Sequence, residues 1–182
     1  MPSWDIAAVV GVPGVGKTSI CEYVSRKIGC QYINYGDLML DIARDENLAE
    51  TNYQMFSLDM ELQYHIWKEA ANIISEKEHT IVDLHGLDQS PRGYLFSMPI
   101  EIISPTLIVL VEANPENIIL QRKADSSKNR IKDDFKSLKI HMQMLRVSMA
   151  ISSVILGSGL YLLKNNNLND SQKELTNLLE NF

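Results

Sequence analysis

The stretch GVPGVGKT, residues 11–18, decides the fold of this chain. It matches the pattern G-x-x-x-x-G-K-[ST], whose glycines let the backbone turn tightly and bring its N–H groups against phosphate oxygens. Lys17 adds a cation for the β- and γ-phosphates, and the Thr18 hydroxyl is a ligand for Mg²⁺. A chance match is the competing interpretation. An apolar strand before the motif and a helix after it argue against chance, because the mechanism needs that setting.

We therefore predict that this loop and the residue after it bind nucleotide phosphates. The residues concerned are Gly11, Val12, Pro13, Gly14, Val15, Gly16, Lys17, Thr18 and Ser19.

Strand-like and helix-like segments alternate outward from the loop. We predict strands at 5–10, 31–34, 80–84, 106–112 and 160–164. We predict helices from the loop to 28, over 36–47 and 58–77, from Asn114-Pro115, over 133–156, and from a capping box at 171–174. Proline and glycine in 89–99 predict a loop. The alternation indicates an α/β fold with a parallel sheet covered on both faces, and ligands bind such sheets at the carboxyl ends of the strands.

Length and composition describe one ordinary globular domain. The chain has 182 residues, 45% of them apolar and 22% charged, with a formal net charge of −6. That charge disfavours nucleic acid as a partner. The apolar runs are too short and interrupted to span a bilayer, and the N-terminus lacks the features of a signal peptide. We expect Cys21 and Cys30 to be reduced in a cytoplasmic protein, with no structural zinc because there is no CxxC pair.

Polar residues follow the second and third predicted strands, where an acceptor would lie. Asn34 to Asp37 either hold a flat base or form an ordinary strand-to-helix turn. Asp83 ends an apolar strand beside the loop, so we predict that it orients water on Mg²⁺ rather than capping a loop. His85 either contacts the acceptor or satisfies a buried backbone group. Arg92 either clamps an acceptor phosphate or is a solvated surface arginine.

Arginines surround a short polar segment after the fourth predicted strand. Arg122 and Arg130 flank residues 123–129, and Arg146 lies on the long helix that follows. Phosphoryl transfer needs cations and the exclusion of water, and arginines beside a short polar segment suit a closing lid. A solvated basic stretch is the alternative interpretation. Beside a phosphate-binding loop we favour the lid, with Lys17, Arg122, Arg130 and Arg146 as catalytic residues.

Six blocks, taken together, resemble archaeal-type adenylate kinases, a branch of the P-loop nucleoside monophosphate kinases. They are GVPGVGKTS (11–19), INYGDLML (33–40), VDLHG (82–86), PRGYLFSMP (91–99), LIVLVEANPENIILQRKADSSKNR (107–130) and the helix of Arg146. The first block is generic. The INYGD and RGYL blocks are more particular, and they indicate AMP as the acceptor.

The resemblance implies a single domain over 1–182 with a five-stranded sheet in the order 2-3-1-4-5. It implies an AMP-binding region at about 34–78 and a short lid at about 122–134. It further implies Mg-ATP as donor, with contacts at the loop and Arg122, and a homotrimer. The apolar helix at 142–155 either supplies that interface or is a buried core helix. The implied AMP contacts are Asn34, Tyr35, Gly36, Asp37, Met39, Asp83, His85, Arg92, Gly93 and Tyr94.

Two positions depart from the pattern of these kinases. Bacterial and eukaryotic adenylate kinases carry an arginine near the position of Leu40, and archaeal-type members often have one where Gln89 stands. The resemblance then leaves Arg92 and Arg44 as alternative cations for the AMP phosphate. Another kinase of the same fold, and a P-loop ATPase or binding module without an acceptor, are the alternative functions.

Overall fold

A computed structural model describes residues 3–90, 93–124 and 134–182. Five strands form one parallel sheet in the order β2-β3-β1-β6-β7. Their bounds are Ile6–Val10 (β1), Gln31–Asn34 (β2), Thr80–Leu84 (β3), Leu107–Glu112 (β6) and Gly159–Lys164 (β7). This confirms the predicted α/β fold and strand order, since β6 and β7 are the fourth and fifth predicted strands.

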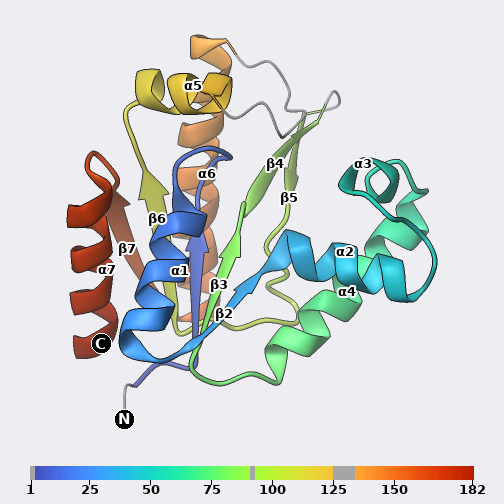
Figure 1. Cartoon of the computed structure of the whole chain (residues 1–182), viewed down its shortest axis with the longest axis horizontal. Coiled ribbons are helices and arrows are strands. Elements are labelled where there is room, and N and C mark those ends of the chain that lie inside the picture. Colours follow the sequence, from blue (N-terminus) through green and yellow to red (C-terminus); the bar gives the residue numbers. More distant parts are fainter. Residues whose placement is uncertain (1–2, 91–92, 125–133) are drawn as a thin grey trace.

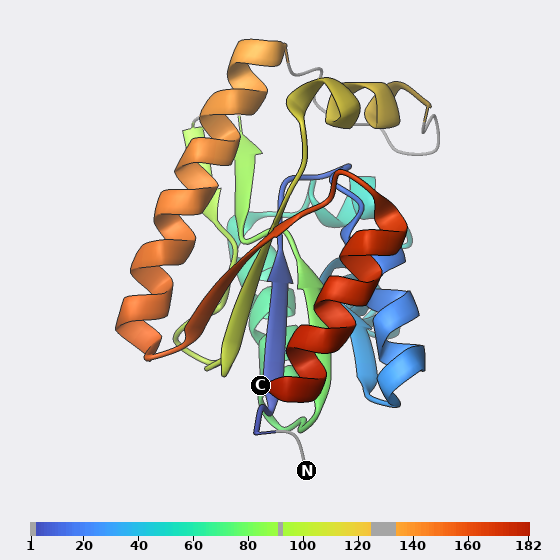
Figure 2. The same ribbon diagram turned by 90° about the vertical axis from the view of Figure 1, so that its left-hand side faces the viewer.

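Helices cover both faces of this sheet. The helices α1 (Lys17–Ile28) and α7 (Leu168–Asn181) pack together on one face, and α6 (Phe135–Leu156) covers the other (Figure 2). Every residue of β1, β3 and β6 is buried, which explains why these strands read as continuous apolar runs. The phosphate-binding loop follows β1 at the edge of the sheet where the central strands end (Figure 1).

An arm of three helices projects from the β2 side of the sheet (Figure 1). It consists of α2 (Tyr35–Asp45), α3 (Asn52–Met55) and α4 (Met60–Ser75). The sequence predicted α2 and α4 with slightly longer bounds and did not predict α3. A capping box formed by Thr51 and Gln54 begins this single helical turn. One turn is too short to show the apolar period from which a helix is predicted.

The prediction of a loop over 89–99 is wrong. Strand β4 (Leu87–Ser90) pairs antiparallel with β5 (Gly93–Phe96) in a separate two-stranded hairpin. Proline and glycine predict a break over the whole segment, whereas Gly93 is itself the first residue of β5 and pairs with Ser90 of β4. Turn residues mark the end of a hairpin as readily as a loop.

The last helix begins earlier than predicted. Asn167 caps α7 by accepting hydrogen bonds from the N–H groups of Asn169 and Asp170. The capping box at 171–174 therefore does not open the helix, and Ser171 lies buried in its first turn. In contrast, α5 (Pro115–Ala124) begins at Pro115, as Asn114-Pro115 predicted, with the Glu116 N–H donating to Asn114 Oδ1.

Cys21 is buried and Cys30 half-buried, and both are free thiols, as predicted. No helix within the described ranges is long and apolar enough to cross a membrane.

Candidate active site

The phosphate-binding loop joins the end of β1 to the start of α1. Gly16 caps α1 at a φ of 95°, in the left-handed region that glycine adopts without strain. Lys17 is only 6% exposed, and its ammonium donates to the Gly11 carbonyl at 2.8 Å. The lysine side chain thus folds back over its own loop. This is the position that a cation needs in order to contact a phosphate held by the loop.

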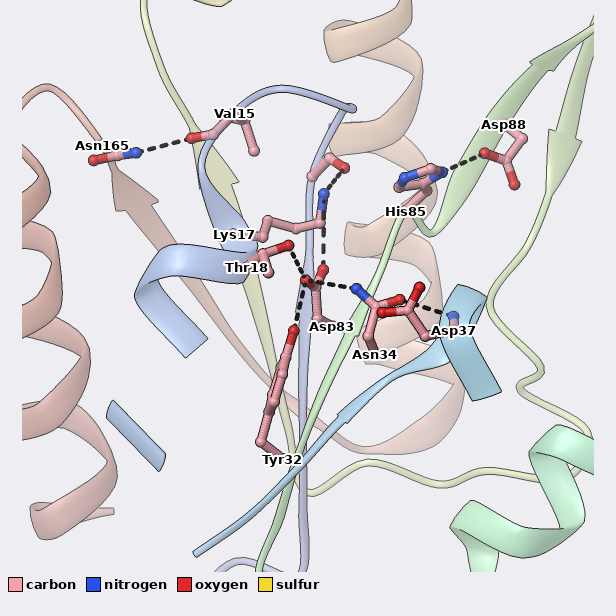
Figure 3. Close-up of polar contacts among 11 residues, drawn as sticks. Val15, Lys17, Thr18, Tyr32, Asn34, Asp37, Asp83, His85, Asp88 and Asn165 are labelled. Carbon is pink, nitrogen blue, oxygen red and sulfur yellow. Dashed lines mark hydrogen bonds and ion pairs between the residues drawn. The ribbon is translucent and has the colours of Figure 1, made fainter. Parts of the chain in front are cut away.

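Asp83 is the polar centre of the site. It is the residue before the last of β3 and is 3% exposed, and its Oδ1 lies 3.9 Å from Lys17 Nζ. Thr18 Oγ1 donates to Oδ2 of the same carboxylate at 2.8 Å. The Tyr32 hydroxyl and Asn34 Nδ2 donate to Oδ2 at 3.4 Å each, so side chains from α1 and β2 converge on one carboxyl group of β3 (Figure 3). Burial, followed by the nearby Asp83 charge, raises the pKa of Tyr32, which keeps its phenol protonated as a donor.

Two of the predicted arginines lie on this edge of the sheet. Arg122 Nε donates to the Pro13 carbonyl at 2.7 Å, and the side chain lies against Gly14, where an added Cβ would approach Arg122 Cγ to 2.9 Å. Arg146 forms a two-pronged pair with Glu112 at 2.9 and 2.6 Å. The hydrogen bond and charge of Glu112 raise the pKa of Arg146. Both guanidinium groups are therefore held in place from α5 and α6.

The residues expected to contact AMP on α2 divide into two groups. Asn34 lies at the site, because it bonds Asp83 and also caps α2 by accepting from the Asp37 N–H at 3.1 Å. Tyr35 and Met39 are buried in the arm. The Tyr35 hydroxyl donates to the Trp67 carbonyl at 2.7 Å, tying α2 to α4. Burial raises the pKa of this phenol too.

The hairpin brings a second set of predicted residues to the edge of the sheet. His85 is exposed just after β3, and its Nδ1 lies 2.7 Å from Asp88 Oδ1 on β4. Tyr94 on β5 is half-buried, with its ring 5.4 Å from that of His141 on α6. Gln89 Nε2 donates to Ser137 Oγ at 2.9 Å, which joins the hairpin to the start of α6. Arg92 and Arg130 lie outside the described residues.

Sequence reasoning missed two side chains. Tyr32, on β2, bonds Asp83 across the sheet. Asn165, just after β7, donates from Nδ2 to the Val15 carbonyl at 2.8 Å, across 150 residues of chain (Figure 3). Neither belongs to a local motif. The one usable signal was the position of Asn165, which lies just beyond the carboxyl end of a predicted strand.

A cleft beside the loop is a third feature absent from the prediction. It has a volume of about 380 Å³ and lies between α5 and the turn after β7. Gly16, Asn117, Gln121, Asn165 and Leu168 are among the residues that line it. The cleft opens next to the phosphate-binding loop, so a nucleoside placed there is contiguous with its phosphates.

The donor set at Thr18 and Asp83 fits a magnesium ion. One hydroxyl and one carboxylate oxygen lie 2.8 Å apart, and Mg²⁺ is usually held by one or two such groups together with water and phosphate oxygens. Within 3–90, 93–124 and 134–182, no group of three or more His, Cys, Asp or Glu residues is arranged to hold a metal. The site can thus share a metal with a nucleotide, although it is not a metal cage made by protein alone.

Solved structures of kinases share this architecture. Shikimate kinase from Acinetobacter baumannii matches with a TM-score of 0.68 at 13% identity, covering 99% of this chain and 96% of that one. Shikimate kinase from Bacteroides thetaiotaomicron matches with a TM-score of 0.62 at 16% identity, covering 98% and 99%. A family model described as AAA domain matches residues 10–139. The fold and the loop thus define a P-loop protein with the architecture of small kinases.

Curated archaeal proteins are similar over nearly the whole chain. An "adenylate kinase homolog" of Methanothermobacter thermautotrophicus is 46% identical, covering 95% of this chain and 91% of its own. The protein named adenylate kinase in the same organism is 32% identical, covering 96% and 99%. Adenylate kinase of Thermoplasma acidophilum is 33% identical, covering 87% and 88%. The chain belongs to the adenylate kinase family of P-loop phosphotransferases.

Proposed function

We propose that this protein is an adenylate kinase, which moves the γ-phosphoryl group of ATP to AMP and gives two molecules of ADP, reversibly and with Mg²⁺. The observation that carries the proposal is the convergence on Asp83. Lys17 and Thr18 from the donor loop and Asn34 from the start of the acceptor arm all reach this carboxylate. A donor phosphate and an acceptor bound on these two sides lie next to each other. The naming of the archaeal relatives supports the same activity.

On the donor side, residues 11–19 hold the phosphates through backbone N–H groups and the positive end of α1. The nucleoside occupies the cleft of about 380 Å³ between α5 and the turn after β7. Thr18 and Asp83 would hold Mg²⁺, which would neutralise phosphate charge there. Arg122, already fixed on the loop through Pro13, contacts the donor phosphates.

Transfer breaks the bond between the γ-phosphorus and the oxygen that bridges it to the β-phosphate. A new bond forms to an oxygen of AMP. This acceptor oxygen is already ionised, so the protein need not remove a proton, and its task is to hold cations around the spread charge. Lys17, Arg122, Arg130 and Arg146 supply them. In this proposal, Arg146 reaches the transferring phosphoryl group by breaking one of its two hydrogen bonds to Glu112.

On the acceptor side, AMP lies between the arm at 34–78 and the hairpin, and a lid at about 122–134 closes over both nucleotides. Acidic side chains outnumber basic ones over 34–78, so that arm does not supply the cation for an anionic phosphate. Arg44 donates from Nε and Nη2 to the Glu50 carbonyl, within a loop of the arm. Arg92, which precedes β5 in the sequence, is therefore our choice for the AMP phosphate.

Two matched variants test that choice. Arg92→Ala should raise the KM for AMP by about 10- to 100-fold, because a charge-assisted hydrogen bond to phosphate is lost. Arg44→Ala should change this KM by less than about threefold. The reverse pattern would assign the AMP phosphate to Arg44 instead.

The activity itself is tested by coupled assays with ATP and each nucleoside monophosphate in turn. We expect ADP to form rapidly with AMP and slowly with CMP or UMP. A compound joining two adenosines through five phosphates should compete with both substrates. Absence of ADP with AMP, together with turnover of another acceptor, would overturn the assignment.

One observation favours a second candidate, a kinase for a hydroxyl group. A hydroxyl acceptor must lose a proton, and His85, with its Nδ1 at Asp88 Oδ1, presents Nε2 as a base beside the site. If this candidate holds, His85→Asn should lower turnover of the hydroxyl acceptor about 100-fold. If AMP is the acceptor, the same variant should leave kcat within a few-fold, because no proton has to be moved.

An exposed apolar stripe supports a homo-oligomer, which we propose to be a trimer. Six side chains on the outer face of α6 are spaced by three or four residues, which is the period of a helix-packing seam. They are Ile140, Met144, Val147, Ile151, Val154 and Ile155. Light scattering should give three times the chain mass. Val147→Asp combined with Ile151→Asp should give the monomer. A monomeric wild type would refute the proposal.

We also propose a cytoplasmic location, which two free cysteines support, since reduced thiols are usual in that compartment. Fractionation of cells with an antibody to the chain tests it. Recovery with the soluble fraction is expected, and recovery with membranes would contradict it.

A further inference from the structure

Asn165 makes a contact that the transfer reaction does not by itself explain. It lies just beyond β7, and its backbone N–H donates to the Glu112 carbonyl at 2.7 Å, which prolongs the pairing of β7 with β6. Its side chain then reaches the phosphate-binding loop, where Nδ2 donates to the Val15 carbonyl at 2.8 Å (Figure 3). A residue from the far end of the chain thus holds one peptide group of the loop.

The held peptide is the one between Val15 and Gly16. In a trans peptide the C=O and N–H bonds point in opposite directions. When the carbonyl is fixed on Asn165, the Gly16 N–H must point away from Asn165, to the other side of the peptide. The N–H groups of such a loop are its phosphate-binding groups. Rotation of this peptide would replace a donor by a carbonyl oxygen that repels phosphate.

Gly16 has little intrinsic resistance to that rotation. Its φ is 95°, and glycine populates positive and negative φ about equally, so the residue alone does not fix the peptide. A side chain at this position is nonetheless strained, because at this φ an added Cβ would lie 2.5 Å from Asn165 Nδ2 and Asn165 would have to shift. The absence of a side chain at residue 16 lets Asn165 approach the loop closely, but it also leaves the backbone of the loop free to rotate. The hydrogen bond from Asn165 then limits that rotation.

The carboxamide of Asn165 is oriented from its other end. The buried Ser171 hydroxyl lies 3.1 Å from Asn165 Oδ1 and donates to it. With Oδ1 as the acceptor, Nδ2 is directed to Val15. Ser171 also lies 3.3 Å from the Lys164 carbonyl and 3.0 Å from the Asn167 carbonyl, and one hydroxyl hydrogen serves these acceptors in turn. The first turn of α7 thereby becomes a support for the loop.

We propose that Asn165 is a positioning residue for phosphate binding, which holds the Val15–Gly16 peptide with its N–H directed to the phosphates. The inference rests on the phosphate-binding part of the proposed function and is independent of the identity of the acceptor. It assigns Asn165 a role in binding the polyphosphate, in addition to its place in the wall of the nucleoside cleft.

Two probes separate these roles in the full-length protein. Magnesium tripolyphosphate has no base and reports on the loop, whereas adenosine has no phosphate and reports on the cleft. Dissociation constants for both are measured by calorimetry for each variant. Because both probes bind only folded protein, the ratio of the two constants is insensitive to any loss of folded fraction.

Asn165→Ala should weaken tripolyphosphate binding about 3- to 10-fold relative to adenosine, the net effect of one hydrogen bond. Asn165→Asp should weaken it more, because a carboxylate oxygen then faces the Val15 carbonyl. Ser171→Ala should give a smaller loss in the same direction. Asn169→Ala, the same change at an exposed residue of α7, is the matched control and should leave the ratio unchanged.

The outcomes are distinct. If Asn165→Ala weakens adenosine and leaves tripolyphosphate unchanged, Asn165 only lines the cleft, and the inference is wrong. Equal weakening of both probes also contradicts it. If wild-type protein fails to bind tripolyphosphate, the proposed donor site itself is wrong. In kinetic assays, the variant should raise the KM for ATP and leave the KM for AMP unchanged.

Discussion

The donor and acceptor sides of the site are built in opposite ways. On the donor side, Lys17 and Asp83 are buried, Arg122 is fixed on the loop, and Asn165 holds the loop from behind. On the acceptor arm, large apolar side chains face outward, with Tyr53 79%, Phe56 62% and Met60 69% exposed. A polyphosphate has the same shape in every reaction of such a loop, so its site can be fully formed in advance. The acceptor side is left open, and specificity must be decided there.

The largest effect should follow from removing the buried cation of the donor side. Lys17→Met should lower kcat about 10³-fold, because no other group of the loop carries a positive charge to the β- and γ-phosphates. Steady-state kinetics with ATP and AMP measure the change. Lys27→Met, at an exposed lysine on the last turn of the same helix, is the control and should stay near wild type. A comparable loss in both variants would contradict the assignment.

Removing the carboxylate shared by both sides should have the next largest effect. Asp83→Asn keeps the shape of the side chain and should lower activity about 10- to 100-fold, because the group that orients the metal loses its charge. Titrating Mg²⁺ should show a raised requirement and partial recovery at high concentration. The exposed Asp41→Asn serves as comparison. A loss of rate with an unchanged Mg²⁺ dependence would mean that Asp83 only supports Lys17.

A pair of glycines tests how tightly the loop is held. Gly16→Ala should destabilise the protein by about 3 kcal/mol, since positive φ strains alanine and its Cβ displaces Asn165. Gly29→Ala, at a φ of 73° with nothing within 4 Å of the added Cβ, should cost only about 1 kcal/mol. Urea unfolding measures both. Equal losses would show that strain alone matters and that Asn165 yields freely.

The smallest effect concerns the acceptor arm. Tyr35→Phe should lower the free energy of unfolding by about 1 kcal/mol, because the hydrogen bond to the Trp67 carbonyl is lost. The KM for AMP should rise less than threefold, since the hydroxyl is buried between α2 and α4. Tyr53→Phe, at an exposed tyrosine, should leave both quantities unchanged. A tenfold rise in the KM for AMP with unchanged stability would make Tyr35 a direct contact of the acceptor.

The sequence prediction was correct for features that depend on neighbouring residues alone. The glycines and Lys17 of residues 11–18 act through their own backbone, and each apolar strand shows its burial in its own composition. The same logic failed at 89–99, where Gly93 begins β5 and that strand pairs with β4, because pairing between strands is not a property of either strand alone. It failed again at Ser171, whose hydroxyl supports Asn165 rather than opening a helix.

A parallel α/β sheet and a loop for nucleotide phosphates could be predicted from the amino-acid sequence, because both are encoded in short runs of neighbouring residues. Which distant side chains meet at the loop could be seen only in the folded chain. Tyr32, Asn34 and Thr18 reach Asp83 because β3 lies between β2 and β1 in the sheet. Asn165 reaches Val15 because α7 packs beside α1. Such contacts depend on strand order and helix packing, which no local spacing records.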